Sequence, residues 1–461
     1  MVIVFVLVAV LVLAVVVTAN WYMWRRLFRD TTSGPGLVRR AGAVLIAGGW
    51  LLAIGALVAE RSGAPFGLQQ TLAWPGFLWL ALSMYLLLAV VAGEIVRPLL
   101  RRFLDHRARR TDQVPSEGSQ GNDVGTGATR ETATASRTGG TGGATGPATA
   151  HATATHPPNG PGADTPPEGA PEPPATPDPT GTATPVGPSR RLFVSRIVAG
   201  AAAAAAVGTV GYGTYGVLRG PKVKRVTVPL AKLPRAAHGY RIAVVSDVHL
   251  GPVLGRGFAQ KVVDTINGTQ PDLIAVVGDL VDGSVKDLGP AAAPLARLRA
   301  RHGSYFVTGN HEYFSGAEQW VEEVRRLGID PLENARREMP YFDLAGVNDV
   351  AGENEGQGPD FVKALGDRDT ARACVLLAHQ PVQIHEAVEH GVDLQLSGHT
   401  HGGQLWPGNL IASGANPTLA GLDRYGDTQL YVSRGAGAWG PPTRVGAPSD
   451  ITVIELASKQ A

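Results

Sequence analysis

Residues 398–404 have the sequence Gly-His-Thr-His-Gly-Gly-Gln, which places two histidines in one short glycine-rich segment. Polar residues that could share its chemistry occur at four places upstream: Asp247-Val248-His249, Gly278-Asp279, Gly309-Asn310-His311-Glu312 and His379. Each group directly follows a short apolar segment typical of a buried strand. Loops after the carboxyl ends of strands are where α/β sheets place their chemistry. The pattern therefore predicts a single site assembled from several loops of one α/β domain.

The C-terminal part of the chain, residues 223–461, alternates short apolar segments with amphipathic ones. The predicted strands are Arg241–Ser246, Leu273–Val277, Tyr305–Thr308, Ala345–Val347, Cys374–Ala378, Leu394–Leu396, Leu430–Ser433 and Ile451–Leu456. The predicted helices between them are Phe258–Ile266, Ala291–Leu298 and Ala317–Leu327. Strands separated by helices favour a layered α/β domain.

Three long apolar segments precede this domain within residues 1–104: Val2–Trp24, Ala41–Ala59 and Leu72–Val96. Each is about the length that a helix needs to cross the roughly 30 Å hydrocarbon core of a bilayer. We therefore predict three transmembrane helices. A cleaved signal peptide is a poorer explanation of the first segment, because no basic residue precedes it.

Arginine is unevenly distributed among the connections of these helices. Five arginines lie between the first and second segments, and six lie in residues 97–110 after the third, whereas the connection between the second and third contains only Glu60 and Arg61 as charged residues. Cytoplasmic loops carry an excess of Lys and Arg. The N-terminus and the second connection are therefore expected to face away from the cytoplasm.

Residues 105–190 are rich in Thr, Gly, Ala and Pro, and from 111 to 188 they include no Leu, Ile, Phe, Tyr or Trp. Such a segment buries too little apolar area to offset the entropy of ordering, so we predict a disordered linker. Structure formed on binding a partner is the alternative.

Residues 191–218 form a fourth apolar segment, and Arg190 and Arg191 precede or begin it. A fourth transmembrane helix would place everything after Arg219 outside the cytoplasm. The Ser-Arg-Arg-x-Phe pattern at 189–193 also resembles a twin-arginine export signal, although Val194 and Ser195 depart from it. Both interpretations remain open, and the second adds an export machinery as a partner. We expect the segment to be kept as an anchor; a soluble Ala/Gly helix is the remaining alternative.

The overall composition excludes some classes of function. The formal net charge of +2 gives no general case for nucleic-acid binding. Cys374 is the single cysteine, so an intramolecular disulfide and a cysteine-rich zinc site are excluded. Because Cys374 lies in an apolar segment, we expect it to be a small core residue.

The candidate ligands combine carboxylate, imidazole and amide groups, a set that suits Mn, Fe or Zn. One ion needs about four protein ligands, so seven candidates suffice for two ions if one carboxylate bridges them. Each motif alone is unremarkable, since an Asp after a strand is often a cap or turn residue. The prediction depends on the ordered set Asp247, His249, Asp279, Asn310, His379, His399 and His401.

The order Asp-x-His, Gly-Asp, Gly-Asn-His-Glu, His and Gly-His-Thr-His resembles the calcineurin-like metallophosphoesterase superfamily over about residues 240–457. The chain is also similar to a bacterial membrane-associated branch of this superfamily, which includes a twin-arginine-exported phosphoesterase and lipid-sugar pyrophosphatases. This similarity rests on residues 398–404, Leu344–Val347, Ser433–Gly435 and Pro441–Arg444. The resemblance implies a four-layer α-β-β-α sandwich of two mixed sheets.

The resemblance also implies a role for each site residue. Asp247, His249 and His401 would bind the first metal; Asn310, His379 and His399 would bind the second, and Asp279 would bridge them. His311 would face the scissile phosphate as the general acid, and Glu312 would orient His311. Two cations would lower the pKa of a bridging water, so that hydroxide attacks phosphorus in line.

Together these observations predict a membrane-anchored, dinuclear phosphodiesterase or pyrophosphatase whose catalytic domain lies outside the cytoplasm. Its substrate is expected to be a phosphoester, lipid-linked or derived from the cell wall. A catalytically silent metal-binding sensor or scaffold is the alternative. A transporter ranks last, because the predicted spans lack the buried charge that transport sites usually carry.

Overall fold

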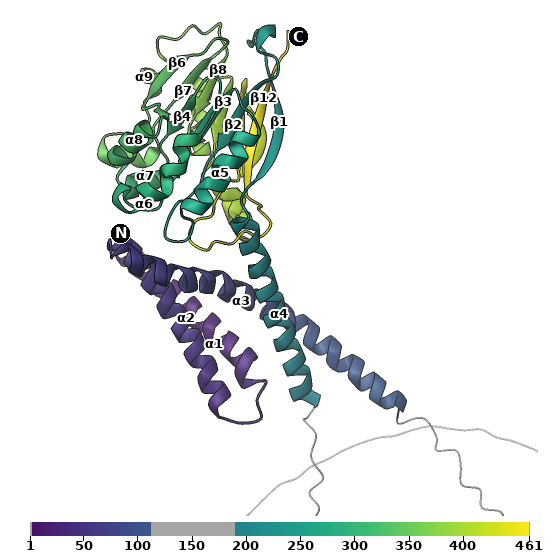
Figure 1. The fold of residues 1–461 in the computed structure, drawn as a ribbon. Helices are drawn as coiled ribbons and strands as arrows, with labels where there is room; N and C mark the ends of the chain where they lie inside the picture. Colours follow the sequence, from purple (N-terminus) through teal and green to yellow (C-terminus); the bar gives the residue numbers. More distant parts are fainter. Residues whose placement is uncertain (1, 112–189, 461) are drawn as a thin grey trace, which may run out of the picture. The chain divides into compact units, whose positions relative to one another are not determined.

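The computed structural model describes residues 2–111 and 190–460. Residues 1–104 and 188–461 form one compact unit. Most of the predicted linker, residues 112–189, lies outside the described residues. The described part consists of four long helices and an α/β domain (Figure 1).

The four long helices are α1 (Val2–Trp24), α2 (Leu37–Arg61), α3 (Phe66–Thr111) and α4 (Arg190–Leu218). By length and composition, each is able to cross a membrane. Helix α3 is longer than the predicted span and continues into the predicted linker. Residues 99–111 contain no Gly or Pro and several Leu and Arg, which are strong helix formers.

Polar contacts join the arginine-rich ends of these helices. Arg196 at the start of α4 donates to the carbonyl of Thr31, between α1 and α2. Glu94 in α3 pairs with Arg26 at 2.7 Å and with Arg97 at 2.9 Å. Glu94 lies within the predicted third span, but its side chain is 35% exposed and its ion pairs make a charge tolerable there.

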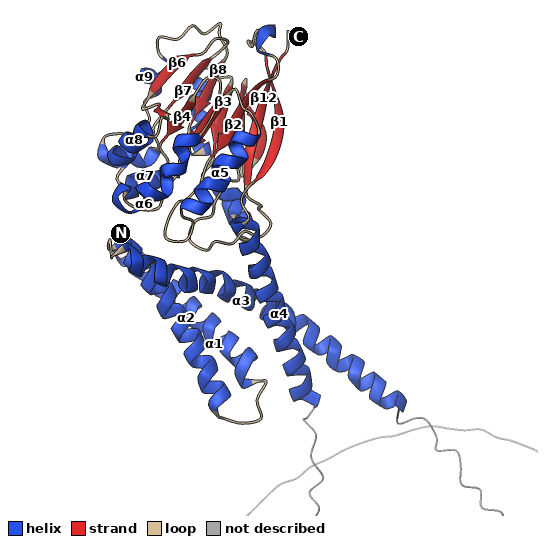
Figure 2. Ribbon diagram, in the orientation of Figure 1, coloured by secondary structure: helices blue, strands red, loops and turns tan. Residues whose placement is uncertain are grey.

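The α/β domain contains two six-stranded sheets, in the orders β1-β12-β2-β3-β4-β5 and β10-β11-β9-β8-β7-β6 (Figure 2). The first sheet comprises β1 (Lys222–Leu230), β12 (Asp450–Ser458), β2 (Tyr240–Val245), β3 (Leu273–Val277), β4 (Ser304–Val307) and β5 (Asp330–Pro331). The second comprises β10 (Gly421–Tyr425), β11 (Thr428–Val432), β9 (Leu394–Ser397), β8 (Cys374–Leu377), β7 (Asp343–Gly346) and β6 (Ala335–Glu338). Both sheets are mixed, but β2, β3 and β4 run parallel, as do β7, β8 and β9. Their carboxyl ends therefore gather at one edge of each sheet.

The two sheets pack face to face through alternate side chains of their strands. Ile242 and Val244 of β2 share a buried cluster with Leu344 and Leu396 of the second sheet. The next residues along β2, such as Val245, point to the opposite face, because successive side chains of a strand alternate. The predicted four-layer sandwich is confirmed.

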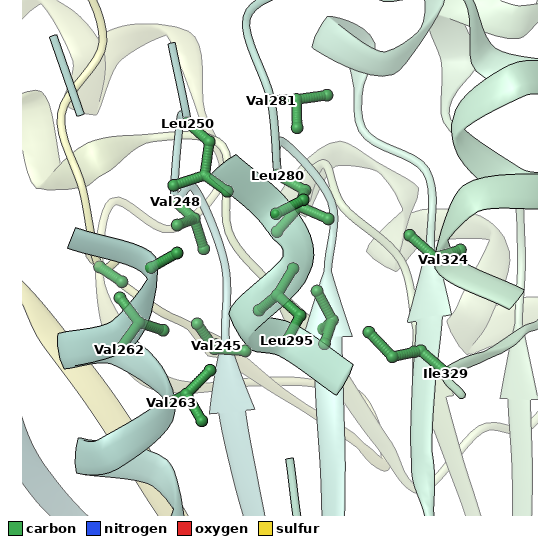
Figure 3. Close-up of a cluster of buried hydrophobic side chains, with 14 of the residues drawn as sticks. Val245, Val248, Leu250, Val262, Val263, Leu280, Val281, Leu295, Val324 and Ile329 are labelled. Atoms are coloured by element: carbon green, nitrogen blue, oxygen red, sulfur yellow. The ribbon is translucent and has the colours of Figure 1, made fainter. Parts of the chain in front are cut away.

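Helices cover the outer face of each sheet. The first sheet packs against α5 (Arg256–Gly268), α6 (Val285–Ala292) and α8 (Ala317–Arg326), with Val262 and Val324 among the side chains of its core (Figure 3). The second packs against α9 (Phe361–Leu365) and α10 (Ile384–Glu389). The remaining helices are α7 (Asn310–Ser315) and α11 (Gly408–Ala415).

The structure agrees with the prediction for Cys374 and differs from the prediction for the helix at residues 291–298. Cys374 is fully buried in β8, as expected of a small core residue. The predicted helix Ala291–Leu298 was misplaced: α6 ends at Ala292, and a 3-10 turn occupies Ala293–Arg297. Pro294 accounts for part of the difference, because proline has no N–H to continue the α-helical hydrogen bonds of the preceding turn.

Candidate metal centre

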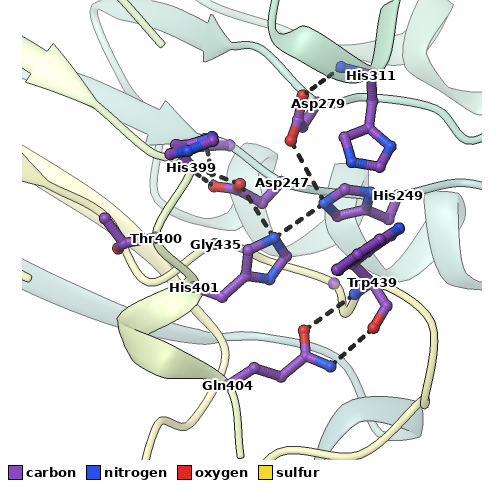
Figure 4. A network of polar contacts seen from close by, with 12 residues as sticks. Asp247, His249, Asp279, His311, His399, Thr400, His401, Gln404, Gly435 and Trp439 are labelled. Atoms are coloured by element: carbon purple, nitrogen blue, oxygen red, sulfur yellow. Dashed lines mark hydrogen bonds and ion pairs between the residues drawn. The ribbon is translucent and has the colours of Figure 1, made fainter. Parts of the chain in front are cut away.

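The sequence-predicted ligands lie at the carboxyl ends of parallel strands from both sheets. Asp247 and His249 follow β2, and Asp279 follows β3. Asn310 begins α7 after β4. From the second sheet, His379 follows β8, and His399 and His401 follow β9. Figure 4 shows several of these side chains converging on one point.

A first group of potential ligands consists of Asp247, His249, Asp279 and His401, whose ligand atoms all lie within 4.8 Å of one another. Nε2 of His401 lies 3.0 Å from Nε2 of His249 and 3.3 Å from Oδ1 of Asp247 (Figure 4). All four residues are buried. Several potential metal-ligand atoms therefore face one small volume.

A second group consists of Asp279, His379 and His399, again with ligand atoms within 4.8 Å of one another. Nδ1 of His399 lies 3.0 Å from Oδ1 of Asn310, which places the amide oxygen beside this group. The structure therefore brings together all seven residues that the sequence pattern singled out.

Asp279 belongs to both groups. Its Oδ2 lies 3.7 Å from Nε2 of His249 and 3.2 Å from Nε2 of His379. Its Oδ1 accepts a hydrogen bond from the main-chain N–H of His311 at 3.0 Å, which fixes the carboxylate (Figure 4). One oxygen of Asp279 thus lies between the two sets of donors, as a bridging carboxylate would.

Two of the four histidine rings, those of His249 and His379, are oriented as metal ligands require. Nδ1 of His379 donates to the carbonyl of Val277 at 2.9 Å, and Nδ1 of His249 donates to Oδ1 of Asp282 at 2.8 Å. A hydrogen bond of this kind fixes the tautomer and leaves Nε2 with a free lone pair. The buried Nε2 of His379 has no hydrogen-bond partner in the described part of the chain. An orphaned nitrogen facing a carboxylate is what a metal site predicts, so the residues fit two cations.

The ionisable groups of the site shift one another's pKa values. Burial lowers the pKa of His399 to about 4, and the nearby charge of His379 adds to the effect. Burial and the charge of His249 hold the pKa of His401 well below its usual value. For Asp279, burial acts in the opposite direction, but the charge of His379 outweighs it and lowers the pKa. His399 and His401 are thus neutral and Asp279 is ionised, which are the forms that bind metals. The pKa values of His249 and His379 are raised, because the nearby carboxylates outweigh burial, so a cation would displace a proton from these two rings.

The backbone is strained at the same residues. Asp247, His249, Asp279, His399 and His401 have φ values of 52°, 49°, 52°, 72° and 53°. Non-glycine residues rarely adopt this left-handed region, and such strain clusters at functional sites.

One glycine is required by close approach. Gly278 has φ +71°, and a Cβ there would lie 2.5 Å from Nδ1 of His379. Its lack of a side chain allows the loop after β3 to pass directly against the loop after β8.

The sequence pattern missed Asp282. Its Oδ1 accepts from Nδ1 of His249 at 2.8 Å and contacts Nδ1 of His311 at 2.7 Å, so it orients both rings. The available signal was its position three residues after Asp279 in the same loop, a second carboxylate beside a predicted ligand.

The expected role of Glu312 was wrong. Its buried carboxylate accepts from the main-chain N–H groups of Gly309, Asp279 and Leu280. It therefore ties the loop after β4 to the loop after β3, whereas the carboxylate that contacts the ring of His311 is Asp282. Three backbone donors satisfy the buried group, as a buried carboxylate requires.

Arg444 is another residue that the pattern did not place at the site. Its side chain is buried. The guanidinium donates to the carbonyl oxygen of His401 at 3.0 Å and lies 3.1 Å from Nδ1 of the His401 ring. Burial lowers the pKa of this guanidinium to about 10. Arg444 therefore holds His401 in place from the loop before β12.

Comparison with known proteins agrees with this geometry. Residues 240–403 match the family model of the calcineurin-like phosphoesterases. A transmembrane protein with a metallophosphoesterase domain from Danio rerio is 40% identical over 54% of this chain and 60% of its own length. A metallophosphoesterase from Helicobacter pylori is 38% identical over 54% of this chain and 67% of its own length. One from Aquifex aeolicus is 35% identical over 52% of this chain and 92% of its own length.

The chain therefore belongs to the calcineurin-like metallophosphoesterase family. The match covers less than two thirds of the Danio rerio relative. The family membership concerns the α/β domain that carries the buried Asp and His clusters.

Proposed function

We propose that the protein is a membrane-anchored phosphoesterase that uses two divalent cations to hydrolyse a phosphodiester or a diphosphate. The position of Asp279 carries the proposal, because its Oδ2 lies between Nε2 of His249 and Nε2 of His379. In this proposal the first cation is held by Asp247, His249 and His401, and the second by Asn310, His379 and His399. Mn, Fe and Zn all suit this donor set.

When bound, the two cations supply an activated water nucleophile and offset charge on the phosphoryl group. His311 is the proposed general acid for the leaving alkoxide. Nδ1 of His311 contacts Asp282. The side chain of His311 is 15% exposed, and this residue lines the cavity in front of the site. Its Nε2 is therefore the nitrogen left to donate a proton to a leaving group.

The pKa of His311 suits this role. Burial alone would lower the pKa, but the hydrogen bond and charge of Asp282 outweigh burial and raise it to about 9. The imidazolium therefore persists through neutral pH and is lost as the pH rises through that pKa.

Replacing Asp282 by Asn is expected to move the alkaline limb of the kcat–pH profile to lower pH. The mutation removes the negative charge that stabilises the imidazolium of His311, so the acid form is lost earlier. The profile would be measured from pH 6 to 10. Asp287→Asn, which neutralises another carboxylate on the same cavity, is the control and should leave the limb in place. An unchanged limb in Asp282→Asn would contradict the acid role.

We also propose that the catalytic domain lies outside the cytoplasm. The arginine distribution supports this orientation, and the contact of Arg196 with Thr31 agrees with an alternating path of the four helices. The same proposal includes membership of the bacterial membrane-associated branch of the superfamily. It holds whether or not residues 189–193 act as a twin-arginine export signal. The transmembrane relative from Danio rerio supports the membrane location. No role for nucleic acid is proposed.

The test is metal-dependent hydrolysis by the full chain. Purified protein stripped with EDTA would be assayed with bis(4-nitrophenyl) phosphate and 4-nitrophenyl phosphate, before and after adding Mn²⁺. We expect no turnover without metal, recovery with it, and faster hydrolysis of the diester. Two metals bound per chain with no turnover of either ester, or of a diphosphate, would instead favour a catalytically silent sensor.

A further inference from the structure

The candidate metal centre faces a cavity of about 1160 Å³. One part of its lining contains Asp279, Asn310, His311 and His399. Another part comes from α2, α3 and the turn between them, and includes Leu57, Glu60, Arg61, Phe66 and Met84. Helices long enough to cross a membrane therefore form part of the wall of the candidate active site.

Packing and hydrogen bonding hold this helical wall against the α/β domain. Phe66 packs against the core on the helix-covered side of the first sheet, and Val253 packs against the cluster of Ala56 and Phe77. The hydroxyl of Tyr85 in α3 donates to the carbonyl of Trp406 at 2.8 Å. These contacts hold the helices against the α/β domain, so they form a defined wall of the cavity.

Apolar side chains lie on both sides of the cavity, and the helical side also carries the charged residues Glu60 and Arg61. Phe314 and Trp439 flank His311, with ring centroids 5.7 Å and 5.6 Å from its ring, and are 76% and 52% exposed. Figure 4 shows Trp439 beside the histidines. Leu57 and Met84 extend the apolar lining on the helical side.

Exposed apolar side chains continue beyond the cavity on α11. Leu410 and Ile411 are 67% and 80% exposed. Helix α11 directly follows the loop that contains His401, and Gly408 at its start lines the cavity. Large exposed apolar side chains next to a polar site mark a surface that contacts lipid or an apolar ligand.

The size and the lining of the cavity indicate which class of substrate it accepts. Sites for ordinary small molecules have volumes of about 300–1,000 Å³. A small water-soluble phosphoester would contact only the part of the cavity next to the metal centre and leave Leu57, Phe66 and Met84 without a role. A substrate with a phosphate at one end and an apolar chain at the other matches both parts of the lining.

We propose that the substrate is a phosphoester of a membrane amphiphile. Its phosphate reaches the metal centre, while its apolar chain lies along the wall formed by α2 and α3 and extends toward the bilayer. This inference rests on the proposed phosphoesterase function and adds the class of substrate.

The test compares two diesters with the same reactive centre, methyl 4-nitrophenyl phosphate and octyl 4-nitrophenyl phosphate. The full chain in lipid nanodiscs would be assayed with Mn²⁺, with the octyl ester below its critical micelle concentration. We expect kcat/KM to be at least about tenfold higher for the octyl ester, because its extra methylenes leave water. If only monoesters are turned over, phenyl phosphate and 4-octylphenyl phosphate form the pair.

Two variants separate the cavity wall from partitioning of the octyl ester into the bilayer. Phe66→Ser and Met84→Ser are each expected to reduce the octyl-to-methyl ratio several-fold. Val362→Ser, at a 70% exposed position on α9, is the matched control and should keep the wild-type ratio. Metal content would report whether each variant is folded.

Each outcome is decisive. A wild-type ratio near one, or a ratio that neither wall variant changes, would overturn the amphiphile inference and favour a soluble phosphoester. No metal-dependent turnover of any ester or of a diphosphate would refute the proposed function itself.

Discussion

Asp279→Asn is expected to lower kcat/KM by about 10³-fold or more. Asp279 is the one side chain that belongs to both groups of potential ligands, so the change affects both proposed cations at once. Asn has nearly the same shape but no charge, and its amide has only one oxygen. The charge stabilisation supplied by a two-metal site amounts to several kcal/mol, which is equivalent to several powers of ten in rate.

Measurement of metal content by mass spectrometry would accompany the kinetics. We expect fewer than two ions per chain in Asp279→Asn. Asp264→Asn makes the same chemical change at an exposed position of α5 and should retain both activity and metal. Full activity in Asp279→Asn would be incompatible with a bridging carboxylate.

His311→Gln is expected to lower kcat by about 10²–10⁴-fold, the usual contribution of a general acid. Metal content should stay unchanged, because the ring of His311 contacts Asp282 and is absent from the seven proposed ligands. This combination distinguishes an acid from a ligand. The hydrogen bond to Asp279 comes from the main-chain N–H of residue 311, so a change of side chain leaves this donor in place.

The leaving group provides a second readout for His311. A good leaving group such as 4-nitrophenolate needs little protonation, whereas an alkoxide needs much, so the loss should be larger for an alkyl diester. His238→Gln, at an exposed position before β2, is the control. Equal losses with both leaving groups would argue against proton donation by His311.

Much of the fold was visible in the sequence because its strands are short, apolar and followed at once by polar loops. The predicted strand Leu273–Val277 has the bounds of β3, and the other seven lie within one or two residues of observed ones. The strands that were missed include β1 and β6, which lie at the edges of the sheets and contain several charged residues. An edge strand has a solvent-exposed side, and its sequence therefore lacks a continuous apolar pattern.

The candidate ligands were predictable for a related reason. Asp247, Asp279 and His379 each directly follow a predicted strand or lie within two residues of its end, and parallel strands bring their carboxyl ends to one edge. Local sequence thus specified the side chains that meet, even though His249 and His401 are 152 residues apart.

The residues that position the site could not be predicted in this way. Asp282 contacts the rings of His249 and His311, which belong to different segments. Arg444 contacts His401 from a loop near the end of the chain. Glu312 belongs to a recognisable motif, yet its partners are main-chain groups of two other loops. These roles depend on which loops lie against each other, and no periodicity or motif records that.

By itself, the sequence determined the class of fold, the four long apolar helices and the set of polar side chains gathered after the strands. Each of these follows from local composition and spacing, which act along a few neighbouring residues. Only the tertiary structure decided which oxygen of Asp279 lies between the two groups, which carboxylate orients His311, and that Phe66 and Met84 share a cavity with the site. Those arrangements arise from packing between distant segments, because the close-packed interior fixes positions that no local pattern specifies.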